Sequence, residues 1–236
     1  MNQISPLRGL SGVRQSLVRP TYRILTSAHD SVVDLFDAVD ALDAARRKAN
    51  SSPKGRKSKS EIDILRSAIV LTSAGLDASM KRLVKDVGRY LIGRDGTGTR
   101  HEYEEHLKRE MAKRRVSEPF HQAVLAVDPA EKLLVFYLAE KTKASFQGSR
   151  DLKIRVRHTL GMSKSVVPDS VLENLDSFFD ARNEIVHDMD LRNPSTDSVA
   201  RKHCDVEMVA EQCNLVFDVA VSLILGAVEA CKKAKK

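Results

Sequence analysis

This chain of 236 residues has few aromatic side chains, which make up 5% of it and include no tryptophan. Aromatic residues are enriched in β-strands, so their scarcity argues against a sheet-rich fold. Alanine, leucine, valine and charged residues dominate instead, a composition that favours helices. We therefore expect an all-α protein, and the length is sufficient for one domain with a full hydrophobic core.

Cysteine is also scarce, and Cys204, Cys213 and Cys231 do not have the CxxC spacing of a redox or zinc motif. We expect three reduced thiols in the core of a protein from a reducing compartment, the cytoplasm. The sequence has no paired cluster of metal ligands. Neither a structural zinc ion nor any other cofactor is therefore expected.

Long apolar runs are missing too. The longest, residues 219–228, is far too short to span a bilayer, and no membrane association is predicted. Residues 1–25 contain no carboxylate but carry Arg8, Arg14, Arg19 and Arg23. An organellar transit peptide and an unstructured basic arm share this composition, and we favour the arm. The predicted organisation is a basic arm over 1–25 and a helical domain over 26–236.

Positive charge is abundant, with a formal net charge of +7 and a pI near 9.3. Lysine and arginine release condensed counterions from nucleic acids, so a polyanion such as RNA is the expected partner. The cations gather in a basic loop at 50–60, at 113–115, at 150–158 and in a basic tail at 232–236. Any one tract also fits a solvated face or tail. The residues predicted to contact RNA are Lys54, Arg56, Lys57, Lys59, Arg155 and Arg157.

Apolar periodicity and turn residues predict the helices. Ser60 followed by Asp63 resembles a capping box at the start of the second helix. The last helix is apolar almost all round in its later half, which fits either the buried centre of a bundle or one face of a dimer interface. The expected ranges are 26–49, 60–91, 100–115, 128–144, 148–160, 168–191 and 196–232.

The helix expected at 168–191 contains the residues most typical of chemistry, Arg182, Asn183 and His187. Arginine binds phosphate through a planar fork, and histidine transfers protons near neutral pH, so the two can act on a phosphodiester without a metal. A loose search also pairs Arg100 with His106 and Arg114 with His121. Pro119 lies between Arg114 and His121, and proline breaks the interior of a helix. Arg100 begins just after a Gly/Thr loop.

On a regular helix, Arg182 and His187 project about 140° apart, so one helix does not aim both at a single phosphate. Asp176, Asp180, His187 and Asp190 are predicted to share the polar side of Asn183. Either an irregular helix end before Pro194 or a second copy of the motif across an interface would bring Arg182 and His187 together. The last helix, Leu172 and Phe179 are candidates for the contact in a dimer.

The string from Ala181 to His187, late in a helical chain and followed by one more long helix, resembles the signature of HEPN domains (higher eukaryotes and prokaryotes nucleotide-binding), and most of all their RiboL-PSP branch. The resemblance covers roughly residues 25–232, although only the short motif is specific. It implies an all-α, HEPN-like helical bundle with a long C-terminal helix, a homodimer with a composite active site, and a catalytic set of Arg182, His187 and Asn183.

The same resemblance implies a metal-independent endoribonuclease that leaves a 2′,3′-cyclic phosphate and a 5′-hydroxyl. Such an enzyme acts as a toxin, a phage-defence effector or an RNA-processing nuclease, with an antitoxin or sensor protein as a further partner. Two alternatives stay open. One is a non-catalytic HEPN-like module that binds a partner protein or a nucleotide, and the other is a basic helical nucleic-acid binder without chemistry.

Overall fold

The computed structural model describes residues 3–10, 16–50, 57–193, 195–196 and 199–234. These residues form an all-α fold, and the one piece of β pairing among them is an isolated bridge between Leu191 and Arg201. The elements are a 3₁₀ turn η1 (Ser16–Val18), α1 (Arg19–Asn50), α2 (Lys59–Ile92), α3 (Gly98–Met111), α4 (Glu118–Val124), α5 (Pro129–Thr142), α6 (Ser149–Asp151), a π-helical turn η2 (Leu152–His158), α7 (Asp169–Glu173), α8 (Asp176–Asp188) and α9 (Val206–Lys233).

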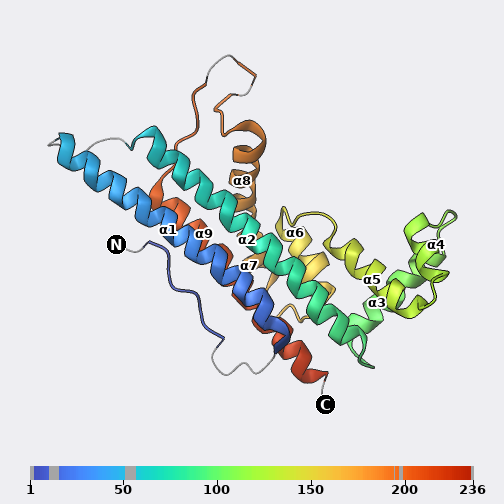
Figure 1. Cartoon of the computed structure of the whole chain (residues 1–236). Helices are drawn as coiled ribbons and strands as arrows, with labels where there is room; N and C mark the ends of the chain where they lie inside the picture. The colour runs from blue at the N-terminus through green and yellow to red at the C-terminus, as the bar shows by residue number, and fades with distance from the viewer. Residues whose placement is uncertain (1–2, 11–15, 51–56, 194, 197–198, 235–236) are drawn as a thin grey trace.

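Three long helices, α1, α2 and α9, run alongside one another and form the body of the molecule (Figure 1). Their contact is close where α1 crosses α2, because a Cβ atom on Gly75 would lie 2.3 Å from the Cβ of Ala28. Only glycine fits at such a distance. Any larger residue at position 75 would push α1 and α2 apart.

Helix α9 is the buried centre of this body. Most of its apolar side chains are buried, and those of Val216, Phe217, Leu223 and Ile224 are at most 2% exposed. By length and composition α9 also qualifies as a membrane span, but 61% of that stretch is buried inside the protein. Of the two interpretations of this helix, burial in the bundle is the one the structure adopts.

The start of α2 is fixed by a capping box that lies two residues before the one that the sequence predicted. The Ser58 hydroxyl accepts a hydrogen bond from the Glu61 amide at 3.2 Å, and the Glu61 carboxylate accepts one from the Ser58 amide at 2.6 Å. The prediction of Ser60 and Asp63 as the capping pair is therefore wrong. Asp63 instead points to two arginines described below.

The other end of α2 leads to a lobe built from α3, α4 and α5 (Figure 1). Helix α4 was not predicted because Pro119 reads as a helix breaker. In the structure Pro119 lies in the first turn of α4, where its missing N–H leaves no hydrogen bond unmade. Tyr137 of α5 is fully buried within this lobe, and its ring makes edge contacts with the rings of Tyr103 and His106 of α3.

The N-terminal segment packs on the helices. Ile4 is 2% exposed, and the Ser5 amide donates a hydrogen bond of 2.9 Å to Asn214 of α9. Residues 16–25 are helical, since η1 and the first turns of α1 include them. The expectation of an unstructured arm is therefore wrong for residues 3–10 and 16–25. Residues 11–15, including Arg14, lie outside the described part of the chain.

Two predicted helices are shorter than expected. The segment expected at 168–191 is divided into α7 and α8, with Asn174 and Leu175 between them. The last helix begins at Val206 rather than near 196, because the carboxylate of Asp205 caps it by accepting hydrogen bonds from the amides of Glu207 and Met208. The freed segment before Asp205 lies against the end of α8 through the bridge of Leu191 with Arg201.

Candidate active site on helix α8

Helix α8 holds the three predicted catalytic residues. Arg182 and Asn183 are half-buried, and the Nη1 group of Arg182 donates a hydrogen bond of 2.9 Å to Oδ1 of Asn183. His187 is exposed in the last turn of the helix. Asn183 thus orients the arginine rather than the imidazole.

One polar atom in this group has no hydrogen-bond partner. The Nε atom of Arg182 is buried and makes no hydrogen bond with any residue that the structure describes. A buried donor left unpaired destabilises a protein by about 1–3 kcal/mol, so such groups tend to mark a place where another molecule completes the bonding. Because the Nε atom is buried, an acceptor from outside the chain reaches it only after a shift of the Arg182 side chain.

The inner face of α8 explains why Arg182 sits at the edge of the core. Phe178 and Phe179 are at most 1% exposed and anchor the helix in the bundle. The prediction that Leu172 and Phe179 contribute to a dimer contact is wrong, because both are buried within the protomer. The apolar surplus of α9 is likewise covered by its neighbours in the same chain.

Arg182 and His187 do not converge within one protomer. Both lie in the regular part of α8, which continues to Asp188, so they project about 140° apart with a rise of about 7.5 Å between them. The helix does end irregularly, but only after His187. An irregular helix end consequently does not bring the two residues together.

The end of α8 has an uncommon backbone. Met189 and Asp190 have φ values of 51° and 59°, in the left-handed region that few non-glycine residues adopt. The Asp190 amide donates to the carbonyl of Glu184 at 3.0 Å, which closes the end of the helix. The Asp190 side chain is buried in an ion pair with Arg66 of α2, whose Nε lies 2.6 Å from Oδ2. The prediction that Asp190 belongs to the polar stripe beside Asn183 is therefore wrong.

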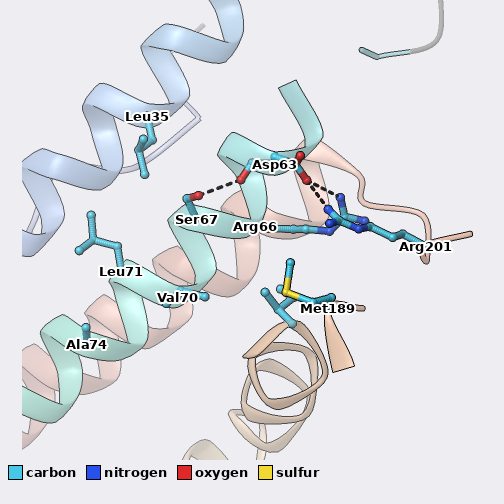
Figure 2. A pocket seen from close by; sticks show the side chains of 10 residues that line it. Leu35, Asp63, Arg66, Ser67, Val70, Leu71, Ala74, Met189 and Arg201 are labelled. Carbon is cyan, nitrogen blue, oxygen red and sulfur yellow. Dashed lines mark hydrogen bonds and ion pairs between the residues drawn. The ribbon is translucent and has the colours of Figure 1, made fainter. Parts of the chain in front are cut away.

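A network of charges joins α2 to the segment that follows α8. Oδ1 of Asp63 lies 3.1 Å from Nη1 of Arg66 and 2.5 Å from Nη1 of Arg201, as Figure 2 shows. Arg66 also donates to the carbonyl of Lys202 at 3.2 Å, and the Lys202 amide donates to the carbonyl of Asp190 at 2.9 Å. The network fixes both the end of the motif helix and the position of the two cations at 201 and 202.

An apolar groove of about 570 Å³ opens between α1, α2 and α8. Figure 2 looks into it, with Asp63, Arg66 and Arg201 at one end. The Met189 side chain in its wall is 56% exposed, so the groove is open to solvent at this point. The apolar side chains of the groove are Leu35, Val70, Leu71, Ala74, Ile185 and Met189.

A basic hollow of about 600 Å³ adjoins the apolar groove and shares Arg66, Met189 and Arg201 with it. The hollow lies between the start of α2 and the segment after α8. Nζ of Lys202 is 2.6 Å from Oε1 of Glu184 on α8, which ties the hollow to the motif helix. Its lining consists of Lys57, Lys59, Arg66, Arg201 and Lys202 together with Ile62, Met189, Leu191 and Val199.

The predicted RNA-binding residues are divided by the structure. Lys57 and Lys59 line the basic hollow, whereas Lys54 and Arg56 lie outside the described residues. Arg157 is 5% exposed, with its guanidinium bonded to the carbonyl of Val167 and the carboxylate of Asp169. It has no surface to offer to RNA, and the prediction for Arg157 is wrong.

Arg155 also has a structural role. Its guanidinium donates to the carbonyls of Lys141 and Ser145 at 3.0 and 3.1 Å and lies 4.3 Å from the centre of the Phe146 ring. These bonds satisfy backbone acceptors in the last turn of α5 and just after it. Arg155 is half-buried, and its contact with RNA stays a prediction.

Three cations of the basic hollow, Arg66, Arg201 and Lys202, were not predicted as functional. Arg201 meets Asp63 from 138 positions away, a distance in sequence over which no local pattern predicts contact. The available signal was the pair of consecutive cations shortly after the motif helix. Among the described residues there is no group of three or more histidine, cysteine, aspartate or glutamate side chains able to hold a metal ion.

Comparisons of the chain with protein-family models, with curated proteins and with solved structures found no match. The fold and the site therefore define an all-α protein with an Arg–Asn–His motif on one helix and a basic hollow beside it. The resemblance to HEPN domains stays a prediction that depends on that motif.

Proposed function

We propose that this protein is a metal-independent endoribonuclease of HEPN type that acts in the cytoplasm. The observation that supports this best is the half-buried guanidinium donor of Arg182, positioned by Asn183 on the same helix as the exposed His187. A phosphate oxygen is an acceptor of the right charge and shape for that donor. The excess of basic residues in the chain favours RNA as its source.

In the proposed reaction, the 2′-hydroxyl of a ribose attacks its own phosphorus and displaces the 5′-oxygen of the next nucleotide. His187 takes the proton that leaves the 2′-hydroxyl and, as the imidazolium, gives a proton to the departing 5′-oxygen. Arg182, held by Asn183, stabilises the negative charge that develops on the phosphoryl oxygens. The products are a 2′,3′-cyclic phosphate and a 5′-hydroxyl.

The active form in this proposal is a two-fold dimer. Because Arg182 and His187 diverge on one helix, a phosphate contacts both only where two motif helices meet, with one residue from each copy. The apolar groove between α1, α2 and α8 is the surface we assign to the dimer, since it borders the motif helix and is lined by Ile185 and Met189 of that segment.

The test is cleavage of total RNA in EDTA by the wild-type protein and by His187→Ala. We expect cleavage by the wild type and a loss of about 10²-fold or more in the variant, the usual scale for removing a general acid or base. His203→Ala is the matched control, because His203 is exposed and lies outside the motif helix. Equal cleavage by wild type and His187→Ala, or loss of wild-type activity in the chelator, contradicts the proposal.

A second variant separates catalysis from folding. Arg182→Met removes the guanidinium together with its buried unpaired donor. We expect cleavage to fall by about 10²-fold while the midpoint of urea unfolding stays the same or rises. A large loss of stability in Arg182→Met would mean that Arg182 serves the fold instead.

One observation favours the second candidate function, a non-catalytic module that binds a partner protein, such as an antitoxin or a sensor. Asp180 and Asp188 are exposed on α8, on either side of the motif. These carboxylates repel RNA and favour a basic partner surface. If the protein has this second function, the wild type cleaves no RNA, and His187→Ala gives the same result as the wild type in the cleavage assay.

A further inference from the structure

We propose that the basic hollow binds the backbone of single-stranded RNA, and that it holds the strand beside His187. This inference rests on the proposed function for the identity of the nucleic acid. It assigns Arg201 and Lys202, which follow the motif helix, to the same binding surface as Lys57 and Lys59 at the start of α2.

The charge of the hollow selects an anion. Five cations line it, and three carboxylates are paired with them: Asp63 with Arg66 and Arg201, Asp190 with Arg66, and Glu184 with Lys202. The five cations outnumber these three carboxylates by two, which equals the charge of Lys57 and Lys59. An excess of this kind, concentrated in a concave surface, attracts a phosphate backbone more strongly than the same charges spread over a flat one.

The ion pairs also give the cations fixed positions. Asp63 holds Arg201 at 2.5 Å, and Glu184 holds Lys202 at 2.6 Å, while each cation keeps donors that its carboxylate does not use. Bound phosphate thus meets cations whose side chains are already ordered, which lowers the entropy lost on binding.

The apolar lining selects a single strand. Ile62, Met189, Leu191 and Val199 stand among the cations, and Val199 is 86% exposed. A duplex keeps its bases stacked inside and offers mainly phosphate and sugar to a protein. A single strand offers unstacked bases as well, and these gain free energy by covering exposed apolar side chains.

The hollow is close to the motif along the chain. Met189 lies in its wall two residues after His187, and Lys202 contacts Glu184, one turn before His187 on α8. A strand that occupies the hollow therefore leaves it next to the last turn of α8. The nucleotides in the hollow flank the phosphate to be cleaved and do not themselves react.

The first test measures binding without cleavage. A fluorescent ten-nucleotide 2′-O-methyl RNA, which lacks the attacking hydroxyl, is titrated with wild type and with the triple variant Lys57→Gln/Lys59→Gln/Lys202→Gln. We expect the variant to bind about tenfold or more weakly at moderate salt. The slope of log K against log salt should fall by about 2, because three phosphate contacts to a single strand are lost.

The matched control is Lys113→Gln/Arg114→Gln/Arg115→Gln, which removes the same charge. These residues are exposed between α3 and α4, in the lobe at the other end of α2 from the hollow (Figure 1). Helix α2 has 34 residues and is therefore about 50 Å long, so the two sites are well separated. We expect the control to keep most of the affinity. Equal losses in both triple variants, or no loss in either, would overturn the assignment of the hollow.

The second test concerns strandedness. Wild type should bind the single strand about tenfold or more tightly than a 2′-O-methyl duplex of the same length. Val199→Ser should weaken binding of the single strand alone, with little effect on folding since Val199 is exposed. A preference for the duplex, or a Val199→Ser variant with unchanged affinity for the single strand, contradicts the proposal of a single-stranded ligand.

The two proposals fail separately. If the hollow variants lose binding but the wild type cleaves no RNA, the hollow is a binding site and the nuclease proposal is wrong. If the wild type cleaves RNA and the hollow variants bind and cleave as it does, the nuclease proposal stands and the substrate lies elsewhere.

Discussion

Asp190 shows how one residue sets the geometry of the motif helix. Its left-handed backbone ends α8, and its carboxylate is the buried partner of Arg66. A left-handed aspartate is unfavourable by itself, so the ion pair and the hydrogen bond to Glu184 must stabilise the turn. Asp190 also contributes to the position of Lys202, because its carbonyl accepts a hydrogen bond from the Lys202 amide.

Asp190→Ala should lower the free energy of unfolding by about 3–5 kcal/mol, because it leaves the buried Arg66 without its main partner. Urea unfolding followed by circular dichroism measures the change. Asp188→Ala, an exposed neighbour, is the control and should change stability by less than about 0.5 kcal/mol. A loss below about 1 kcal/mol for Asp190→Ala would mean that the pair is weak or solvated.

Two cysteines give a prediction that depends on pH. Burial raises the pKa of the Cys204 and Cys213 thiols to about 11, so each is almost entirely protonated in the folded protein near neutral pH. The thiolate is the reactive form, and raising its pKa lowers its population at every pH below 11. Their alkylation by iodoacetamide in the native protein should therefore keep accelerating up to about pH 11.

In urea the same thiols should react near their ordinary pKa, and their rate should level off about two pH units earlier. Peptide mapping by mass spectrometry separates the three cysteines. Native Cys213 that reacts at pH 8 as fast as in the unfolded chain would show that the core around α9 opens readily.

At the scale of elements, the start of α2 decides where the basic hollow lies. The capping box of Ser58 and Glu61 fixes the first turn and with it Lys57 and Lys59. Sequence patterns locate helix ends to within a few residues, which is too coarse to choose between two serines. The structure chooses Ser58 because its hydroxyl, and not that of Ser60, accepts the Glu61 amide.

Ser58→Ala should destabilise the protein by about 1 kcal/mol, since it removes the hydroxyl that accepts the Glu61 amide. Ser60→Ala is the control, and its exposed side chain in the first turn should matter by less than about 0.5 kcal/mol. Thermal unfolding of both variants compares them. A larger loss of stability in Ser60→Ala than in Ser58→Ala would favour Ser60 and Asp63, the capping pair that the sequence predicted.

At the scale of the whole molecule, the surface left for assembly differs from the one expected. The expected contact was the last helix, but α9 is enclosed by its neighbours and has no broad apolar face to share. The apolar groove between α1, α2 and α8 is open instead. The groove borders α8, the helix that carries Arg182 and His187.

A dimer that uses this groove predicts recovery of activity by mixing. Arg182→Ala and His187→Ala protomers are each inactive, yet a mixed dimer keeps one intact composite site, so we expect a part of the wild-type cleavage to return. Ala74→Asp places a charge in the groove and should yield monomers by light scattering. Ala78→Asp, one turn further along α2 and also exposed, is the control. A wild-type monomer with full activity contradicts the dimer.

Short-range patterns determined much of this protein. Apolar periodicity and composition predicted the all-α class, the long second helix and the helix that carries Arg182 and His187, because these features depend on residues within a few turns of one another. The alternation of apolar and polar residues also limited α9 to a core helix or an interface helix. None of this requires knowledge of the fold.

Tertiary structure decided what those elements do together. Arg66 meets Asp190 across 124 positions and Asp63 meets Arg201 across 138, so the end of α8 and the basic hollow follow from packing. Packing also buries Arg157 against the carbonyl of Val167. A charged side chain looks the same in sequence whether it faces water or a buried carboxylate. Only the packed chain determines which of the two it meets, because desolvation and pairing are set by residues distant in sequence.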